Sequence, residues 1–382
     1  MLDLRAMVKD GLLFRPPTDE DRIEALIPTD RQSNHASYLA ELEDGGLLCA
    51  WFGGSAEGAS DVKVVVSRLP AGQPRWSQPV QLSEPNDRSE QNPFLFPAPT
   101  GELWACYTSQ QTRGVSREEW ERRVVAGEAS GSFSLQETAA IMRRVSGDGA
   151  HTWGPAAPLF DRPGSFCRHR IVVLSNGDWL FPMYYSLPAA GRGTDYSVMQ
   201  VSSDQGQTWA ETEVPGSRGR VHPSAVEIEP GQLLAFFRSR AADRIYLSRS
   251  QDYGRSWSVP ERTVLPNNNA SVHAIKLQDG RIAVVFNCVS ANEDPSKTVW
   301  PKERYPVTIA ISEDRGHTWP YMRHIETGDN YAGQANKHLN RENSYPCLMQ
   351  SRDGRLHVSY TYAGRQCIKY VSVPVSWVTG EA

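Results

Sequence analysis

The sequence predicts an all-β fold, a six-bladed β-propeller formed as one domain by residues 1–382. Three observations favour this fold. A turn close to Ser-x-Asp-x-Gly-x-Thr-Trp occurs four times, a glycine-centred hairpin occurs six times, and 30 glycines and 26 prolines are available to end many short strands. Self-similar segments about 20 to 50 residues apart are typical of propellers and other repeat folds.

The first repeat is the turn, which we call an Asp box. The four boxes begin at Ser146, Ser202, Ser250 and Ser312. The aspartate can accept backbone N–H bonds across a hairpin, the glycine suits a positive φ, and the tryptophan packs beneath the turn. Ala150 takes the glycine position in one box, and residues 67–76 form an eroded fifth copy. Because the boxes recur where a single active site could not, we interpret them as structural.

The second repeat is a loop glycine followed by an apolar strand and preceded by another strand. The six glycines are Gly45, Gly101, Gly177, Gly231, Gly280 and Gly354. Each can close one hairpin of a blade, and the Asp-box turns fall further along the chain, where a second hairpin of the same blade belongs. Six hairpin pairs predict six blades.

The remaining segments are assigned to the edges of this frame. Residues 1–30 are expected to supply a strand that closes the ring, because closure removes an exposed sheet edge. The longer intervals near 111–140 and 289–305 are expected to be insertions at the rim. The first of them is compatible with a short helix that starts at Ser116 and has an acidic first turn.

Composition and charge exclude several functions. The net charge of −4, without a long Lys/Arg run, leaves no electrostatic footprint for nucleic acid or for an anionic membrane. No stretch has the length of a membrane span, and the N-terminus lacks the apolar core of a signal peptide. The six cysteines are scattered singly and are expected to be reduced and buried. We therefore expect a cytoplasmic protein without membrane or nucleic-acid partners, catalytic metal or cofactor; its oligomeric state stays open.

The innermost strands of a propeller line a central channel, so each blade should deliver one residue to a shared pocket. Counting back nine residues from each loop glycine, or ten in the first blade, gives His35, Asn92, Arg168, His222, Ser271 and Tyr345. A purely structural core would place Val, Ile or Leu at several of these positions. The six polar residues therefore predict a binding or active site on the axis, with His222 and Tyr345 as candidate proton-transfer groups.

With its Asp boxes and polar axis, the segment 33–375 resembles the sialidase (neuraminidase) superfamily, in particular the bacterial Asp-box branch with BNR repeats. The resemblance implies three arginines that hold a sugar carboxylate, a tyrosine nucleophile with a glutamate partner, and an acidic acid/base. By position, Tyr345 matches the nucleophile, and Arg238 and Arg304 match the second and third arginines.

The resemblance also places the acid/base and shows two departures. Glu57 falls about where the acidic acid/base lies, with Asp61 close by. His35 stands where the first arginine belongs, and His222 stands where the glutamate partner belongs. Histidine offers a carboxylate one donor and is only partly charged near neutrality, so the grip is expected to weaken unless another arginine contributes. Further expected substrate-binding residues are Arg168, Arg170, Arg365, Asn92 and His169.

Three functions follow from these residues. The first is an exo-acting glycoside hydrolase that releases a terminal acidic sugar, a sialic acid or related ulosonate, with Tyr345 as nucleophile, His222 as base and Glu57 as general acid. The second is a polysaccharide lyase in which Tyr345, with His222 or His35, carries out β-elimination on a uronate glycan. The third is a non-catalytic propeller that binds glycans through the polar axis. We expect the hydrolase first.

Overall fold

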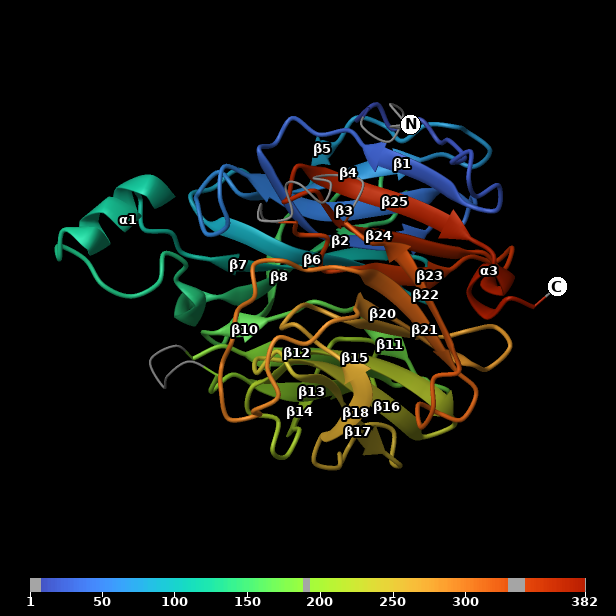
Figure 1. The fold of residues 1–382 in the computed structure, drawn as a ribbon. Coiled ribbons are helices and arrows are strands. Elements are labelled where there is room, and N and C mark those ends of the chain that lie inside the picture. Colours follow the sequence, from blue (N-terminus) through green and yellow to red (C-terminus); the bar gives the residue numbers. More distant parts are fainter. Residues whose placement is uncertain (1–7, 188–192, 329–340, 382) are drawn as a thin grey trace.

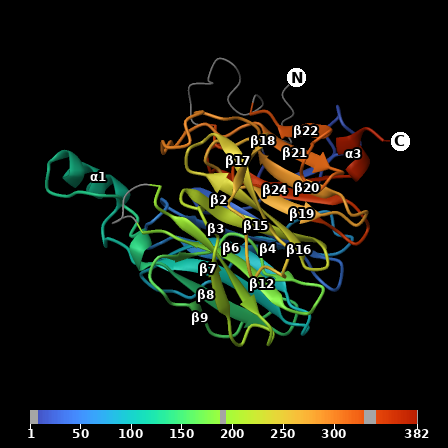
Figure 2. The same ribbon diagram turned by 90° about the horizontal axis from the view of Figure 1, so that it is seen from below.

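The computed structural model describes residues 8–187, 193–328 and 341–381. In these ranges, six antiparallel sheets are arranged as blades around a central axis (Figure 1, Figure 2). Five sheets have four strands and the sheet of the third blade has five. The all-β six-bladed propeller that the sequence predicts is therefore confirmed.

In the first two blades, successive strands pair along the chain, and the third blade departs from this order only at its inner strand. The first blade consists of β2 (Ser33–Glu41), β3 (Leu47–Gly54), β4 (Lys63–Leu69) and β5 (Val80–Gln81). The second consists of β6 (Ser89–Pro97), β7 (Leu103–Gln110), β8 (Ala140–Ser146) and β9 (Ala157–Phe160). The third consists of β10 (Ser165–Phe166), β11 (Val172–Val173), β12 (Trp179–Tyr185), β13 (Tyr196–Ser202) and β14 (Ala210–Glu213), with both β10 and β11 paired to β12.

The remaining blades complete the ring. The fourth consists of β15 (Arg220–Glu229), β16 (Gln232–Ser239), β17 (Arg244–Ser250) and β18 (Glu261–Pro266). The fifth consists of β19 (His273–Lys276), β20 (Ile282–Asn287), β21 (Val307–Ser312) and β22 (Tyr321–Glu326). The sixth consists of β23 (Cys347–Gln350), β24 (Leu356–Tyr362), β25 (Cys367–Val373) and the N-terminal strand β1 (Ile23–Ile27). Strand β1 pairs with β25 from Ile23 opposite Ser372 to Ile27 opposite Ile368, so both ends of the described chain share one blade.

The Asp boxes fold as self-contained hydrogen-bonded turns. In the second box, Asp204 accepts backbone N–H bonds from Gln207 at 3.1 Å and Thr208 at 2.8 Å. Ser202 Oγ donates to Asp204 at 2.7 Å and accepts from the N–H of Gly206 at 2.8 Å. The other three boxes repeat the bonds that centre on the serine and the aspartate. Each turn therefore satisfies its own backbone groups.

The box glycine also packs against the interior. Gly206 has a φ of 83°, which glycine adopts without a steric penalty. A Cβ atom at this position would lie 2.7 Å from the Trp104 side chain of the second blade and 3.1 Å from Trp179 of the third. The two tryptophan rings meet edge to face, with centroids 5.3 Å apart. The turn thus closes the apolar layer between neighbouring blades.

The inner strands are interrupted near their beginnings by β-bulges. The pairing shifts in β2, β6 and β15. In or beside these bulges, and at corresponding places in the fifth and sixth blades, a non-glycine residue adopts a φ between 50° and 58°; these residues are Ala36, Asn92, His222, Asn269 and Tyr345. A left-handed residue redirects its side chain away from the regular alternation of the strand. The same backbone feature therefore recurs in five of the six blades.

The segment 111–140 lies between β7 and β8. It contains α1 (Arg117–Val125), which projects from the body of the propeller (Figure 1), and a single 3₁₀ turn, η2 (Gln136–Thr138). Ser116 caps α1 by accepting the N–H of Glu119. Further along, Phe133 is buried, and a Cβ atom at Gly58 would lie 2.5 Å from Ser134 Oγ. The segment therefore packs tightly against the loop that carries Glu57.

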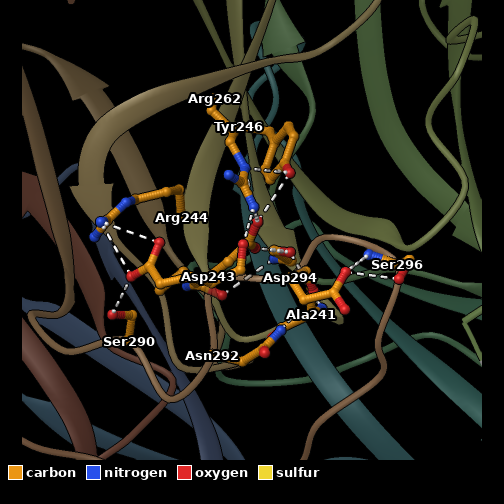
Figure 3. Close-up of polar contacts among 12 residues, drawn as sticks. Ala241, Asp243, Arg244, Tyr246, Arg262, Ser290, Asn292, Asp294 and Ser296 are labelled. Atoms are coloured by element: carbon orange, nitrogen blue, oxygen red, sulfur yellow. Dashed lines mark hydrogen bonds and ion pairs between the residues drawn. The ribbon is translucent and has the colours of Figure 1, made fainter.

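The segment 289–305 lies between β20 and β21 and is held against the turn that joins β16 to β17 (Figure 3). Asn292 Nδ2 donates to the carbonyl of Ala241 at 3.1 Å, and Arg262 donates to the carbonyl of Glu293 at 2.8 Å. Further along, Val299 N–H donates to the carbonyl of Arg240 at 2.9 Å. This segment is thus anchored on the fourth blade.

A short helix, α3 (Val375–Thr379), follows β25 and buries Trp377 and Val378. All six cysteines are free thiols, and all but Cys288 are buried, so they act as small apolar core groups. Within the described ranges, no helix is long and apolar enough to cross a membrane.

Candidate active site

Tyr345 lies at the centre of the candidate site, just ahead of β23, and is only 8% exposed. The guanidinium of Arg238 donates a hydrogen bond to its hydroxyl oxygen. The guanidinium carbon of Arg238 lies 5.3 Å from the centroid of the ring, and those of Arg168 and Arg304 lie 5.5 Å from it. Burial opposes ionisation, but the charges of Arg238 and Arg304 outweigh it and lower the pKa of the phenol below its ordinary value of 10.0. The surrounding charges therefore make this phenol easier to ionise than an ordinary tyrosine.

Arg238 enters from the end of β16 and is fully buried. Its Nε donates to Asn269 Oδ1 at 2.7 Å. Among the described residues, no carboxylate forms an ion pair with it. Burial lowers the pKa of Arg238 to about 10, so it remains charged at neutral pH. An uncompensated buried cation beside an ionisable phenol is a strong attractor for an anion.

Two histidines flank the tyrosine. The rings of His35 and Tyr345 have centroids 4.1 Å apart, and those of His222 and Tyr345 are 5.4 Å apart with an edge-to-face arrangement. Burial, together with the neighbouring arginine charges, holds the pKa of both histidines well below the ordinary value of 6.5. Both imidazoles are therefore neutral at physiological pH.

His222 does not contact the phenol in the way that the sequence predicts for a base. Its Nε2 lies 3.2 Å from the hydroxyl of Tyr184 and 3.5 Å from Arg238 Nη1. The same Arg238 nitrogen donates to Tyr345. Arg238 thus stands between the two residues, and no direct hydrogen bond joins His222 to Tyr345 among those of the described chain.

Glu342 forms the second charged centre of the site. Arg304 Nη1 donates to Oε1 at 3.1 Å and Arg365 Nε donates to Oε2 at 2.8 Å, while His35 Nδ1 lies 3.8 Å from Oε1. Burial opposes ionisation of this carboxyl, but the positive charges of Arg365 and Arg304 hold its pKa far below 4.5. Arg365 also donates to Glu57 at 2.7 Å. The chain of charges runs from Arg304 through Glu342 and Arg365 to Glu57.

Glu57 and Asp61 have different places in this arrangement. The side chain of Glu57 is 34% exposed, whereas that of Glu342 is 7% exposed. Of the two carboxylates that pair with Arg365, Glu57 is therefore the one that solvent reaches. Asp61 accepts from the N–H and the hydroxyl of Ser55, both at 2.8 Å. Asp61 therefore closes the loop that carries Glu57 and does not point a free carboxylate at Tyr345.

Arg168 lies between β10 and β11 of the third blade, and Asn92 lies in β6 of the second blade. The guanidinium of Arg168 donates to the backbone carbonyls of Ala36 at 3.3 Å, Ser37 at 3.1 Å and Tyr345 at 2.9 Å. These bonds hold the backbone of the first and sixth blades together and leave the guanidinium few free donors for a substrate. Asn92 lies in the equivalent bulge of β6, with a φ of 50°.

His169 and Arg170 lie away from Tyr345. The ring of His169 stacks on His273 with centroids 4.7 Å apart. Arg170 borders a cavity together with residues at the far ends of the inner strands, including His273. Of the three arginines expected to support the carboxylate grip, Arg365 pairs with the carboxylates of the site, Arg168 is bonded to backbone carbonyls beside Tyr345, and Arg170 borders the separate cavity.

Sequence reasoning missed Glu342, Arg240 and Asp195. Arg240 forms a buried ion pair with Asp195, with Nη2 2.7 Å from Oδ2, and its charge contributes to the lowered pKa of Tyr345. Glu342 had a sequence signal, because it lies three residues before Tyr345 in the same run. The Arg240–Asp195 pair joins two blades, and no local sequence pattern indicated it. No group of three or more His, Cys, Asp or Glu that could hold a metal lies within the described ranges.

An axial tyrosine surrounded by arginines, in a six-bladed frame held by Asp boxes, defines the sialidase-like class of propellers. The chain belongs to the BNR repeat-like domain family, which its residues 45–358 match. No curated protein sequence matches the chain significantly.

Solved structures show the same fold. The chain superposes on a Hadza microbial sialidase with a TM-score of 0.69 at 17% identity, covering 91% of this chain and 66% of that one. A protein of unknown function from Dyadobacter fermentans gives a TM-score of 0.69 at 16% identity, covering 92% of this chain and 97% of that one. The NanB sialidase from Streptococcus pneumoniae gives a TM-score of 0.69 at 14% identity, with 97% and 71% covered. The predicted resemblance to the sialidase superfamily is confirmed for the fold.

Proposed function

We propose that the protein is an exo-acting glycoside hydrolase of the sialidase type, which releases a terminal sugar that carries a carboxylate. The observation that carries this proposal is the buried Tyr345 hydroxyl, hydrogen-bonded to an arginine without a carboxylate partner. Solved sialidases with the same fold support the reaction class.

The charges of the site suit an acidic substrate. Arg238 is uncompensated, and Arg304 shares its carboxylate, Glu342, with Arg365. A ligand carboxylate could therefore bind between Arg238 and Arg304, and Arg365 would support it from the side. The resemblance implies a first carboxylate-binding arginine that this sequence lacks. In this proposal, Arg365 takes over its role.

In the reaction, Tyr345 first loses its hydroxyl proton to solvent; its oxygen then forms a bond to the anomeric carbon, and the bond from that carbon to the leaving oxygen breaks. Glu57, the exposed carboxyl of the charged chain, donates a proton to the leaving oxygen, and water then hydrolyses the tyrosyl intermediate. Arg238 and Arg304 activate the tyrosine by stabilising its phenolate. His222 acts here by orienting Arg238 and not as the direct base.

The test is a product assay on the purified protein with a sialylated glycan and with a uronate oligosaccharide. We expect free ulosonate from the first and no unsaturated, ultraviolet-absorbing product from the second. Tyr345→Phe should lower turnover by at least about 10³-fold. Tyr370→Phe is the matched control, because it also removes a buried hydroxyl from the sixth blade, one that is bonded to His357, and it should keep full turnover. Full activity of Tyr345→Phe would exclude the mechanism.

One observation favours polysaccharide lysis as a second candidate. His35 is neutral and its ring lies 4.1 Å from that of Tyr345, an arrangement in which one group could abstract the proton α to a uronate carboxylate and the other could protonate the leaving oxygen. Ultraviolet absorbance from the uronate oligosaccharide, with no ulosonate from the sialylated glycan, would select this reaction and exclude the hydrolase.

A further inference from the structure

The end of the central channel opposite Tyr345 contains a cavity of about 340 Å³. It lies between the far ends of β2, β6, β19 and β23, whereas Tyr345 and His35 lie near the beginnings of their strands. The polar residues that border it include Tyr38, Glu41, Arg170, His273 and Lys276. The hydrolase proposed above makes no use of this cavity.

A hydrogen bond at the inner end of the cavity fixes the role of His273. The N–H of Leu348 donates to His273 Nδ1 at 3.0 Å, so Nδ1 is an acceptor. Burial, followed by the charges of Arg170 and Arg168, holds the pKa of His273 well below its ordinary value. The imidazole is therefore neutral, with its single proton on Nε2.

This assignment determines what Tyr38 can do. Its hydroxyl oxygen accepts a hydrogen bond from the backbone N–H of Arg170 at 3.1 Å. The same oxygen lies 3.4 Å from His273 Nε2, the ring nitrogen that carries the proton. Burial raises the pKa of Tyr38, so the phenol keeps its own hydrogen. Among the described residues, no acceptor for that hydrogen is found. Tyr38 is therefore left as an O–H donor where it borders the cavity.

The charges around the cavity are unequal. The guanidinium of Arg170 is exposed and forms no ion pair with a described carboxylate. Lys276 donates to the carbonyl of Ile228 and adds a second positive charge. The only carboxylate among the lining residues, Glu41, accepts from the Arg352 N–H at 3.1 Å and lies 3.9 Å from Arg352 Nε. The cavity therefore presents positive charge and hydrogen-bond donors.

The size and the walls limit the ligand further. Ligand sites in proteins occupy about 300 to 1,000 Å³, so this cavity is at the small end and suits a molecule of about one sugar ring. Leu39, Leu95, Ile275, Leu348 and Met349 form its apolar walls. A small ligand with one anionic group and a compact body matches this combination.

We propose that this cavity is a second binding site, which takes a small carboxylate of about the size of a monosaccharide acid. Arg170 holds the carboxylate, the O–H of Tyr38 donates to it from the inner end, and the apolar walls contact the ring. The site does not depend on the reaction at Tyr345.

The test is calorimetric titration of the full chain with D-glucuronate, D-glucose and inorganic phosphate. Arg170→Gln is the informative variant, because Arg170 is exposed and only its backbone N–H bonds to Tyr38, which keeps the fold intact. Arg117→Gln on the projecting helix α1 is the matched control. We expect glucuronate to bind, Arg170→Gln to weaken this binding by about tenfold or more, and Arg117→Gln to leave it unchanged.

Turnover at the other end of the channel should stay within about twofold in Arg170→Gln, since the variant does not touch that site. Equal affinity for glucuronate in Arg170→Gln and in the unmodified chain would overturn the proposal. Glucose binding as tightly as glucuronate would exclude recognition of the carboxylate. If phosphate displaced glucuronate at equal concentration, the cavity would be a general site for oxyanions, and the proposed selectivity for a carboxylate would be wrong.

Discussion

Two sets of left-handed backbone positions recur in this propeller, one in the Asp boxes of the outer turns and one in the bulges of the inner strands. The boxes repeat almost the same residues, because each must satisfy its own turn and pack beneath it. The inner bulges repeat the backbone but carry five positions filled by Ala, Asn, Asn, His and Tyr. The comparison shows that the outer turns need nearly the same residues in every copy to hold the fold. The inner bulges tolerate different residues, so their side chains can serve binding or catalysis.

The largest effect is expected from a substitution beside the inner bulges. Arg238→Gln removes the cation that donates to Tyr345 and should lower kcat/KM roughly 10²- to 10³-fold. Because the same charge lowers the pKa of the phenol, the phenolate should form at a higher pH in the variant, which ultraviolet absorbance of the tyrosinate can follow. Arg249→Gln, on β17 of the same blade, is the control and should change neither quantity. An unchanged phenolate titration would contradict the electrostatic activation of Tyr345.

A smaller effect is expected from a substitution in an Asp box of the outer turns. Gly206→Ala forces a side chain into a φ of 83° and toward Trp104, at a cost of about 1 kcal/mol for the backbone and about 2 kcal/mol for the overlap. Gly72→Ala has a similar φ of 69° with nothing within 4 Å, so only the backbone cost applies. Urea unfolding should separate the two variants, and activity per folded molecule should stay the same in both. Equal losses would show that the contact with the tryptophan layer contributes nothing.

The smallest effect concerns acid stability. Slight burial opposes ionisation of Asp314, but hydrogen bonds from Thr318 and Ser312 hold its pKa at about 2, below the ordinary 3.8. A depressed carboxyl pKa stabilises the fold above the unfolded pKa, and this contribution is lost as the pH falls through the folded pKa. Asp314→Asn should therefore lower Tm at neutral pH, and the difference should shrink between about pH 4 and pH 2. Asp30→Asn, at an exposed position outside the boxes, serves as the control.

The difference between the two sets also decides how much could be predicted from the sequence. The boxes and loop glycines are local patterns, and they predict six blades. Counting from the glycines also reached Asn92, His222 and Tyr345, because in those blades the left-handed residue lies nine positions before the glycine. In the first blade the count of ten chose His35, whereas the left-handed residue is its neighbour Ala36.

The left-handed residue has a different place where the inner strand is irregular. In the fifth blade the left-handed residue is Asn269, eleven positions before Gly280, and not Ser271. In the third blade the inner strand is divided into β10 and β11, and Arg168 lies in the gap between them. The ion pairs that complete the site, such as Arg304 with Glu342, depend on contacts between blades, which no local pattern reports.

The pairing of β1 with β25 has a consequence for how the molecule is assembled. Ile23 lies opposite Ser372, so the outermost strand of the last blade comes from the beginning of the chain. Among the strands of the six blades, β1 is synthesised before the others and β25 after them, so β1 has no partner until the other blades have been made. The ring is therefore closed by the strand pair with the greatest sequence separation, and we expect this pair to form late and slowly in folding.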